Sequence, residues 1–433
     1  MSTKVFEPTI KGKENLSGKR WSSKFIGREI ISLFSLLILL VVGGVTSAFA
    51  EVCHSPFIKY LTTPEKYMYV MAVDADTKDN DFIAVVDVDI ASPNYGKIIN
   101  KLDLGSKGNE PHHMGYTDDR TKIWAGGLFS PRMWIIDVAS DPVNPKIVKV
   151  IEDGSKITGF AAPHTFYAIP GRMLISYTSK ADGTAPGGIA EFTNDGKFIR
   201  SIPLPEDAPY MYDLGIKPEI NRMITTSWTS VNNFSKVFDQ QDPNQFGNTL
   251  VVWDFKERKP IQIVKINEKP LLELRWARRP GANYGYTNVI GGDSLWMWNQ
   301  KNGSFGFKKV ADVGKGCAPA SLRQSVDDKY LYVSCFGTSE IQAWDISNPE
   351  KPKLHDTVIP GLHHLNMMNI TYDGKRMYVT NSALSTVDYG ADRFGVRLIR
   401  IGPDGKMKMD PFFDVDFTNL PTGPARAHDM LLY

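Results

Sequence analysis

The sequence predicts an all-β protein, a seven-bladed β-propeller closed by pairing of its N- and C-terminal strands. A strand pattern recurs at roughly 40–60-residue intervals, as in repeat architectures. The first copy lacks its first strand, and the last strand has nothing after it. The 433 residues include 36 Gly and 27 Pro, a composition typical of many short strands joined by turns.

The repeat consists of a turn, an apolar strand, a short loop, a strand ending in Asp, a Pro/Asn-rich turn and another strand. Side chains alternate at period two between Gly, Pro, Asn and Asp, which indicates half-buried antiparallel strands. The copies cover 122–125 with 132–137 and 146–151, 172–176, 222–225 with 250–254, 285–290 with 294–298, 327–334 with 340–345 and 353–358, and 376–380 with 396–401. Four strands per unit fit a propeller blade, and we count seven units.

The two chain ends complete one blade. Residues 67–73, 81–89 and 97–104 form the first copy, which begins at its second strand. Residues 427–433 resemble the missing first strand, and pairing the termini removes two exposed edges. We therefore expect a single propeller domain over residues 51–433.

Residues 1–50 form a predicted targeting segment. An apolar run from Ile30 to Val45 leads to Ala48-Phe49-Ala50, a small-x-small cleavage signature, and follows a basic region with Lys19, Arg20, Lys24 and Arg28. Export with cleavage after Ala50 is the first interpretation. An uncleaved N-terminal membrane anchor is the alternative, because Ile30–Ala50 could just span a bilayer. Both place the body outside the cytoplasm, and we expect the periplasm.

Charge and cysteine content narrow the function. The net charge is +2, and residues 1–50 hold seven Lys/Arg against three Asp/Glu, so the remainder is near −2. No basic field is present for nucleic acid. Cys317 and Cys335 could form one bridge across adjacent strands or remain two separate thiols, and the sequence leaves both open.

Six of the eight histidines fall just before a repeat's first strand. In a propeller these first strands line the central channel, so the six imidazoles are predicted to form an arc on four consecutive blades. They are His363 and His364 on blade 7, His428 on blade 1, His112 and His113 on blade 2, and His164 on blade 3. At the corresponding position, just before the first strand, blade 4 has Tyr210 and Tyr212, blade 5 has Arg275 and blade 6 has Cys317.

This arc predicts a metal site. Imidazoles without thiolates suit copper best, with zinc as the alternative. A ligand histidine must be neutral, and its second nitrogen usually needs an orienting carboxylate or carbonyl. Glu110 and Asp429 are the candidates to orient ligands or move protons. For each histidine alone, the competing interpretation is a hydrogen-bonded structural group.

With these residues in place, the chain resembles the selenium-binding protein family, which includes the methanethiol oxidases. The resemblance covers about residues 67–433 and rests on segments 84–89, 110–113, 133–142, 212–214, 249–254, 271–276, 342–349, 373–380 and 423–428. It implies a seven-bladed propeller. In the bacterial oxidases it implies an exported, copper-dependent enzyme that converts methanethiol, O2 and water to formaldehyde, hydrogen sulfide and hydrogen peroxide. The family's histidines match His112, His113, His164 and His428.

The chain departs from the family pattern in three places. No cysteine follows the histidine pair, where animal members carry a loop linked to selenium binding. His363-His364 stands where the family has Gly-Gly-Pro-Gln, and Arg278 stands where the family has a histidine. The expected partners are a small thiol and O2, with membrane contact only through residues 30–50 if they are uncleaved. The alternatives are a non-catalytic periplasmic copper- or selenium-binding propeller and, last, a sugar or lactone hydrolase with calcium-type ligands.

Overall fold

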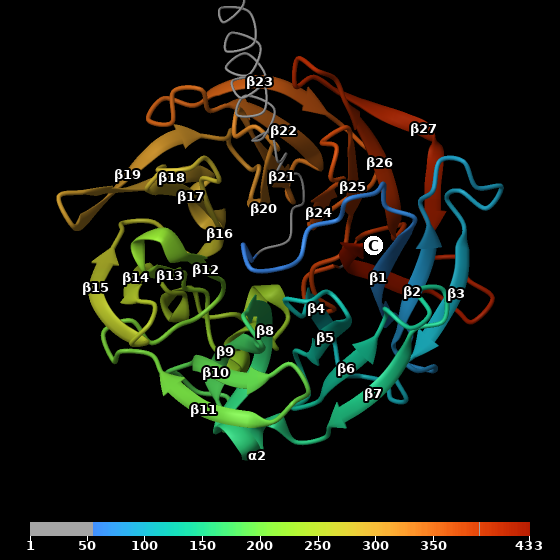
Figure 1. Cartoon of the computed structure of the whole chain (residues 1–433), viewed down its shortest axis with the longest axis horizontal. Helices are drawn as coiled ribbons and strands as arrows, with labels where there is room; N and C mark the ends of the chain where they lie inside the picture. The colour runs from blue at the N-terminus through green and yellow to red at the C-terminus, as the bar shows by residue number, and fades with distance from the viewer. Residues whose placement is uncertain (1–54, 389) are drawn as a thin grey trace, which may run out of the picture. The chain divides into compact units, whose positions relative to one another are not determined.

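The computed structural model describes residues 55–388 and 390–433. It contains seven four-stranded antiparallel sheets arranged as blades around a central axis (Figure 1). The strands, blade by blade, are β28 (Ala425–Leu432), β1 (Tyr67–Asp74), β2 (Phe82–Asp87) and β3 (Ile98–Asp103); β4 (Pro111–Tyr116), β5 (Lys122–Gly127), β6 (Met133–Asp137) and β7 (Lys146–Ile151); β8 (Phe160–Ile169), β9 (Arg172–Lys180), β10 (Gly188–Thr193) and β11 (Phe198–Pro203); β12 (Leu214–Lys217), β13 (Arg222–Thr225), β14 (Thr249–Asp254) and β15 (Lys259–Lys265); β16 (Leu271–Trp276), β17 (Tyr284–Val289), β18 (Ser294–Lys301) and β19 (Ser304–Asp312); β20 (Pro319–Gln324), β21 (Tyr330–Cys335), β22 (Glu340–Asp345) and β23 (Lys353–Val358); and β24 (Met368–Ile370), β25 (Arg376–Thr380), β26 (Gly395–Ile401) and β27 (Met407–Asp416). The predicted seven-bladed propeller is confirmed.

The predicted pairing of the chain ends is also confirmed. β28 is the inner strand of the first blade and pairs antiparallel with β1, from Met68 opposite Leu432 to Asp74 opposite Ala425. The backbone N–H of Lys66 donates to the Tyr433 carbonyl oxygen at 2.8 Å and extends this pairing. The targeting segment predicted for residues 1–50 and the domain boundary that follows it lie outside the described residues.

Apolar packing between neighbouring blades holds the ring together. Each of the seven blade-to-blade contacts has its own buried apolar cluster. Tyr69 and Trp134, for example, join the first two blades, and Val70 and Tyr378 join the first to the seventh. Because every blade has the same inner-to-outer strand order, the seven inner strands run in one direction along the central channel.

Within the described part of the chain, helices are short and confined to connections. They are α2 (Gly154–Thr158), α3 (Val231–Phe234), η1 (Pro218–Ile220), η2 (Phe238–Gln240), η3 (Pro243–Gln245) and η4 (Ile290–Gly292). Within residues 55–388 and 390–433, no helix has the length and apolar character needed to cross a bilayer. Cys317, just before β20, forms a disulfide with Cys335 at the end of β21, so of the two alternatives the bridge is the one present.

Candidate metal centre

β-Bulges in three inner strands aim the histidines at one point. In a regular strand, successive side chains point to opposite faces. In β4, Pro111 pairs with Gly127 and Met114 pairs with Ala125, so two residues, His112 and His113, oppose one. Such a bulge re-aims side chains, which explains how neighbouring imidazoles serve the same site.

The other two strands repeat this device. In β8 the bulge falls at His164 and Thr165, and in β28 it falls at His428 and Asp429. The sequence placed these histidines just before the inner strands, whereas the structure places them within the strands. The bulge is therefore the local feature that the site depends on.

The four imidazoles form one buried cluster. His112 stacks on His428 with ring centroids 3.8 Å apart. His113 lies 4.4 Å from His112 and 4.3 Å from His164. One ligand atom from each of His112, His113 and His428 falls within 4.8 Å of the others, which makes these three a possible metal-binding group.

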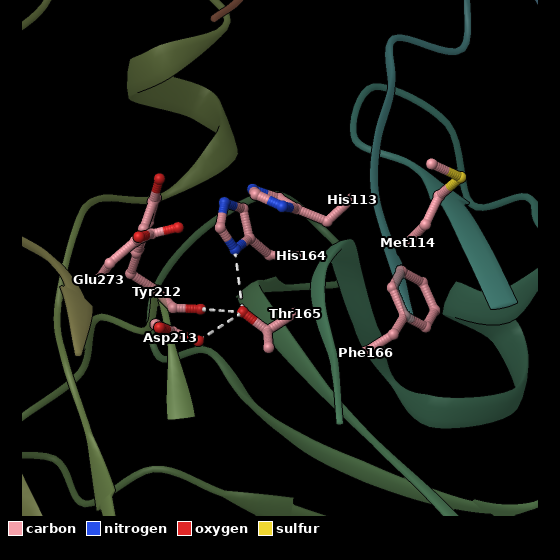
Figure 2. Close-up of a pocket in the computed structure, with 8 residues that line it drawn as sticks. All are labelled: His113, Met114, His164, Thr165, Phe166, Tyr212, Asp213 and Glu273. Carbon is pink, nitrogen blue, oxygen red and sulfur yellow. Dashed lines mark hydrogen bonds between the residues drawn. The ribbon is translucent and has the colours of Figure 1, made fainter. Parts of the chain in front are cut away.

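Hydrogen bonds determine which nitrogen of His164 carries the proton. Its Nδ1 lies 3.3 Å from the Thr165 hydroxyl (Figure 2). That hydroxyl has one proton, and its other neighbours, the Asp213 carboxylate at 3.0 Å and the Tyr212 carbonyl oxygen at 3.3 Å, accept it. Thr165 can therefore only accept from His164, so Nδ1 is protonated and Nε2 keeps a free lone pair.

The other rings are held in a similar way. Nδ1 of His428 contacts the Ser382 carbonyl oxygen at 2.5 Å, and a carbonyl oxygen only accepts, so this nitrogen is protonated. Nδ1 of His113 lies 3.7 Å from Oδ2 of Asp429. Nε2 of His113, His164 and His428 is buried without a hydrogen-bond partner. Three ring nitrogens without a hydrogen-bond partner in one buried cluster fit a metal ion, because a ligand imidazole uses one nitrogen for the metal while a neighbouring group orients the other.

The electrostatics of the cluster keep His112, His164 and His428 neutral. Burial, followed by the neighbouring histidines, holds the pKa values of His112 and His164 well below 6.5. Burial and His113 lower the pKa of His428 to about 3. A metal ligand must be neutral, so these rings are ready to coordinate at neutral pH.

A buried ionic network lies next to the cluster in the channel, and of the two roles that the sequence left open for Arg275, binding an anionic group or pairing with a buried carboxylate, the structure shows the pairing. Asp213 accepts from Arg275 at 3.1 Å, and Arg275 also donates to Glu273 at 2.7 Å. Burial would raise the pKa of Glu273, but Arg275 and Arg323 hold it at about 2. The available signal was an acidic residue within an otherwise apolar strand segment, as at Glu273 in β16.

The two predicted carboxylates occupy different positions. Asp429 lies beside His113 and accepts from the backbone N–H of Met114 at 2.8 Å, so it can orient that ring. Glu110 instead forms a two-point ion pair with Arg426, at 3.0 and 2.8 Å. Its contacts therefore anchor the start of β4 and include none with an imidazole, so its predicted role in orienting ligands or moving protons has no support here.

The blade 7 histidines lie apart from the cluster. His363 is exposed, and His364 stacks on Phe336 at 4.6 Å. Among the described residues, no ring contact joins either one to the four clustered imidazoles, so their predicted role as ligands has no support from the geometry. Arg275 is also not at the start of its strand: it sits next to last in β16 and is held in ion pairs.

An apolar group of loop residues covers the histidine side of the channel. We call it the cap: Leu128, Phe129, Ala162, Trp228, Val231, Phe234, Leu384 and Val387. Trp228 stacks on Phe234 at 4.4 Å and lies 6.4 Å from the His164 ring. Beside His113 and His164 the structure leaves a cavity of about 10 Å³, about the space that one water needs (Figure 2).

Comparison with known proteins gives consistent results. Residues 52–433 match the model of the 56 kDa selenium binding protein family. A methanethiol oxidase from Hyphomicrobium sp is 37% identical, covering 88% of this chain and 89% of that protein. A methanethiol oxidase from Ruegeria pomeroyi is 33% identical, covering 90% and 95%. The crystal structure of a hypothetical selenium-binding protein from Sulfolobus tokodaii superposes with a TM-score of 0.78 at 28% identity, covering 89% of this chain and 96% of that one.

Proposed function

The chain belongs to the 56 kDa selenium binding protein family, and from this premise we propose that it oxidises methanethiol with O2 at a copper ion held by the buried histidines. The coarser activity, an oxidoreductase acting on a sulfur compound, follows from relatives named methanethiol oxidase at 33–37% identity over most of the chain. The observation that carries the site is the set of three bare Nε2 atoms in one buried cluster.

The donor set favours copper. Imidazole nitrogen without thiolate suits copper and zinc, but zinc has no redox chemistry. When bound, copper would supply electron transfer between the thiol sulfur and O2. The proposed ligands are His112, His113 and His428, with His164 completing the set. The two cysteines among the described residues are bonded to each other, so neither offers a thiol for selenium.

The proposed overall reaction balances. Methanethiol, O2 and water give formaldehyde, hydrogen sulfide and hydrogen peroxide: the carbon is oxidised, O2 accepts the two electrons and the C–S bond breaks. The substrate thiol must lose its proton. Asp429, whose Oδ2 lies 3.7 Å from Nδ1 of His113, would orient that ring as a ligand and is the carboxylate beside the cluster that we propose as the acceptor of this proton.

The cap sets the size and polarity of the substrate. Its Trp228 lies against His164 and Tyr212, and the cavity below it is small. An apolar cover favours a small apolar thiol and keeps bulk water from the reacting centre.

We also propose that the enzyme works outside the cytoplasm, in the periplasm. The apolar run before Ala50 supports export. The Cys317–Cys335 disulfide supports an oxidising compartment, because such bonds are rare in the reducing cytosol.

The test measures metal and turnover together. Purified protein loaded with copper and freed of loose ions should retain it stoichiometrically and should consume O2 when methanethiol is added. His428→Ala should lose both properties. His355→Ala is the matched control, because His355 is half-buried on β23 and its ring nitrogen contacts the Asp404 carbonyl oxygen at 2.8 Å, outside the cluster. Retained copper without methanethiol consumption would instead indicate a non-catalytic copper-binding protein.

A further inference from the structure

A second cavity lies near the opposite end of the channel. It has a volume of about 370 Å³, far more than the roughly 30 Å³ that one water occupies. It is lined from β8, β12, β16 and β20, near the carboxyl ends of these inner strands, and by Ser55 and Tyr60. The segment that holds these two residues, drawn in blue, crosses the middle of the ring in Figure 1.

A buried ammonium group without a counter-ion lines this cavity. Lys217 is 5% exposed, and its Nζ donates to the Ala277 carbonyl oxygen at 2.9 Å. Within residues 55–388 and 390–433, no carboxylate forms an ion pair with it, and the one carboxylate among the lining residues, Glu219, is exposed. A lysine is almost never fully buried unless it is paired. Two of its three N–H donors therefore have no acceptor among the residues that the structure describes.

A second unpaired donor lines the same cavity. Gln324, at the end of β20, is 1% exposed, and its Nε2 is buried without a hydrogen-bond partner. A buried donor that makes no hydrogen bond carries a free-energy cost. Two such donors around one cavity indicate a ligand that presents acceptor atoms.

The remaining lining defines the ligand further. Trp276, Leu274 and Ile216 supply apolar wall, and the Trp276 indole N–H is already bonded to the Gly215 carbonyl oxygen at 3.0 Å. The Arg275 guanidinium is taken up by Asp213 and Glu273. The unmet charge is therefore that of Lys217, next to an apolar surface.

We propose that this cavity binds a small organic oxyanion, a carboxylate or sulfonate on a compact apolar body. Lys217 pairs with the anionic group, Gln324 donates to one of its oxygens, and the wall around Trp276 packs against the apolar part. The site shares no residue with the proposed copper ligands, so it does not depend on the proposed thiol oxidation.

The test is calorimetric titration of the full chain with benzoate, methanesulfonate and sulfate. We expect the two organic anions to bind and inorganic sulfate, which lacks an apolar part, to bind more weakly. Lys217→Met should weaken binding roughly tenfold or more, because a charge-assisted hydrogen bond is lost. Lys259→Met, which removes an exposed lysine on β15, is the matched control and should bind as wild type does.

Thermal unfolding provides the independent readout. Lys217→Met removes an unpaired buried charge, so it should fold and melt no lower than wild type, and benzoate should raise the melting temperature of wild type but not of the variant. Gln324→Glu should also abolish binding, because it replaces the amide donor with a carboxylate that repels the anionic group of the ligand. No binding by wild type at millimolar anion, tighter binding of sulfate than of the organic anions, or equal binding by Lys217→Met would overturn the proposal.

Discussion

Replacing Thr165 with valine tests how the channel network prepares the metal centre. The substitution keeps the β-branched shape but removes the hydroxyl, so the Nδ1–H of His164 loses the acceptor that lies 3.3 Å away. His164 is 1% exposed, and water cannot readily replace that acceptor. In the metal-free variant the ring can turn to relieve the unpaired Nδ1–H, whereas a metal on Nε2 holds the ring where that N–H has no acceptor.

The magnitude follows from the cost of that unpaired donor. A buried N–H without a partner costs about 1–3 kcal/mol, and in the variant this cost falls on the metal-bound state, in which the ring cannot turn. Since 1.4 kcal/mol is a factor of ten, metal affinity should weaken by roughly 5- to 150-fold. This range agrees with the roughly 10- to 100-fold loss typical when a hydrogen-bond partner of a ligand is removed.

The assay is competition for Cu(II) against a chromophoric chelator, with electron paramagnetic resonance to count the nitrogen ligands. Thr165→Ser restores the hydroxyl and should restore affinity. Thr287→Val removes a buried hydroxyl that donates to the Asn288 carbonyl oxygen in the fifth blade, so it controls for general loss of stability. If Thr165→Val binds copper within about threefold of wild type and folds normally, the role given to the Thr165 hydroxyl is wrong.

Three further predictions concern pH, the disulfide and the cap. Burial keeps the pKa of His428 at about 3, against about 6.5 in the unfolded chain, so the unfolded state binds more protons below pH 6.5. The free energy of unfolding of the metal-free protein should therefore fall as the pH falls, by up to about 1.4 kcal/mol per pH unit for each such histidine. Denaturant titrations between about pH 7 and about pH 5 check this prediction, and an unfolding free energy that does not change with pH contradicts it. Replacing both Cys317 and Cys335 with alanine should lower the free energy of unfolding by about 3 kcal/mol, because their bond closes a loop with a sequence separation of 18; the same denaturant titration applies, and an unchanged midpoint rules it out. Trp228→Ala should open the cap and shift kcat/KM toward ethanethiol over methanethiol by roughly tenfold; an unchanged ratio would show that the cap does not select the substrate.

The blades were predictable because their signals are local. Alternating side chains and turn residues predicted β22 and β23 with the ends that the structure has. The closing pair of strands was predictable from an imbalance: one copy lacked a strand, and the chain end offered one. The first inference needs only the two-residue alternation of side chains along a strand, and the second needs only the free-energy cost of an unpaired strand edge.

The details of the site were less predictable because they depend on register. A bulge adds one residue to a strand without changing its composition, so the sequence predicted His112 and His113 for one site without showing the backbone irregularity that brings both rings to it. The pairing of Glu110 with Arg426 joins residues that are 316 apart in the chain. The link from His164 through Thr165 to Asp213 likewise crosses two blades, so only the closed ring brings these groups together.

The last strand ties the proposed metal centre to closure of the ring. His428 lies five residues before Tyr433, on the strand that also seals the ring. A chain that stops early, or one still being synthesised, lacks both the closing strand and this imidazole. The proposed copper ion can therefore meet a full donor set only after the strand that carries His428 has been made and has closed the ring, and a product truncated before that strand is left without metal.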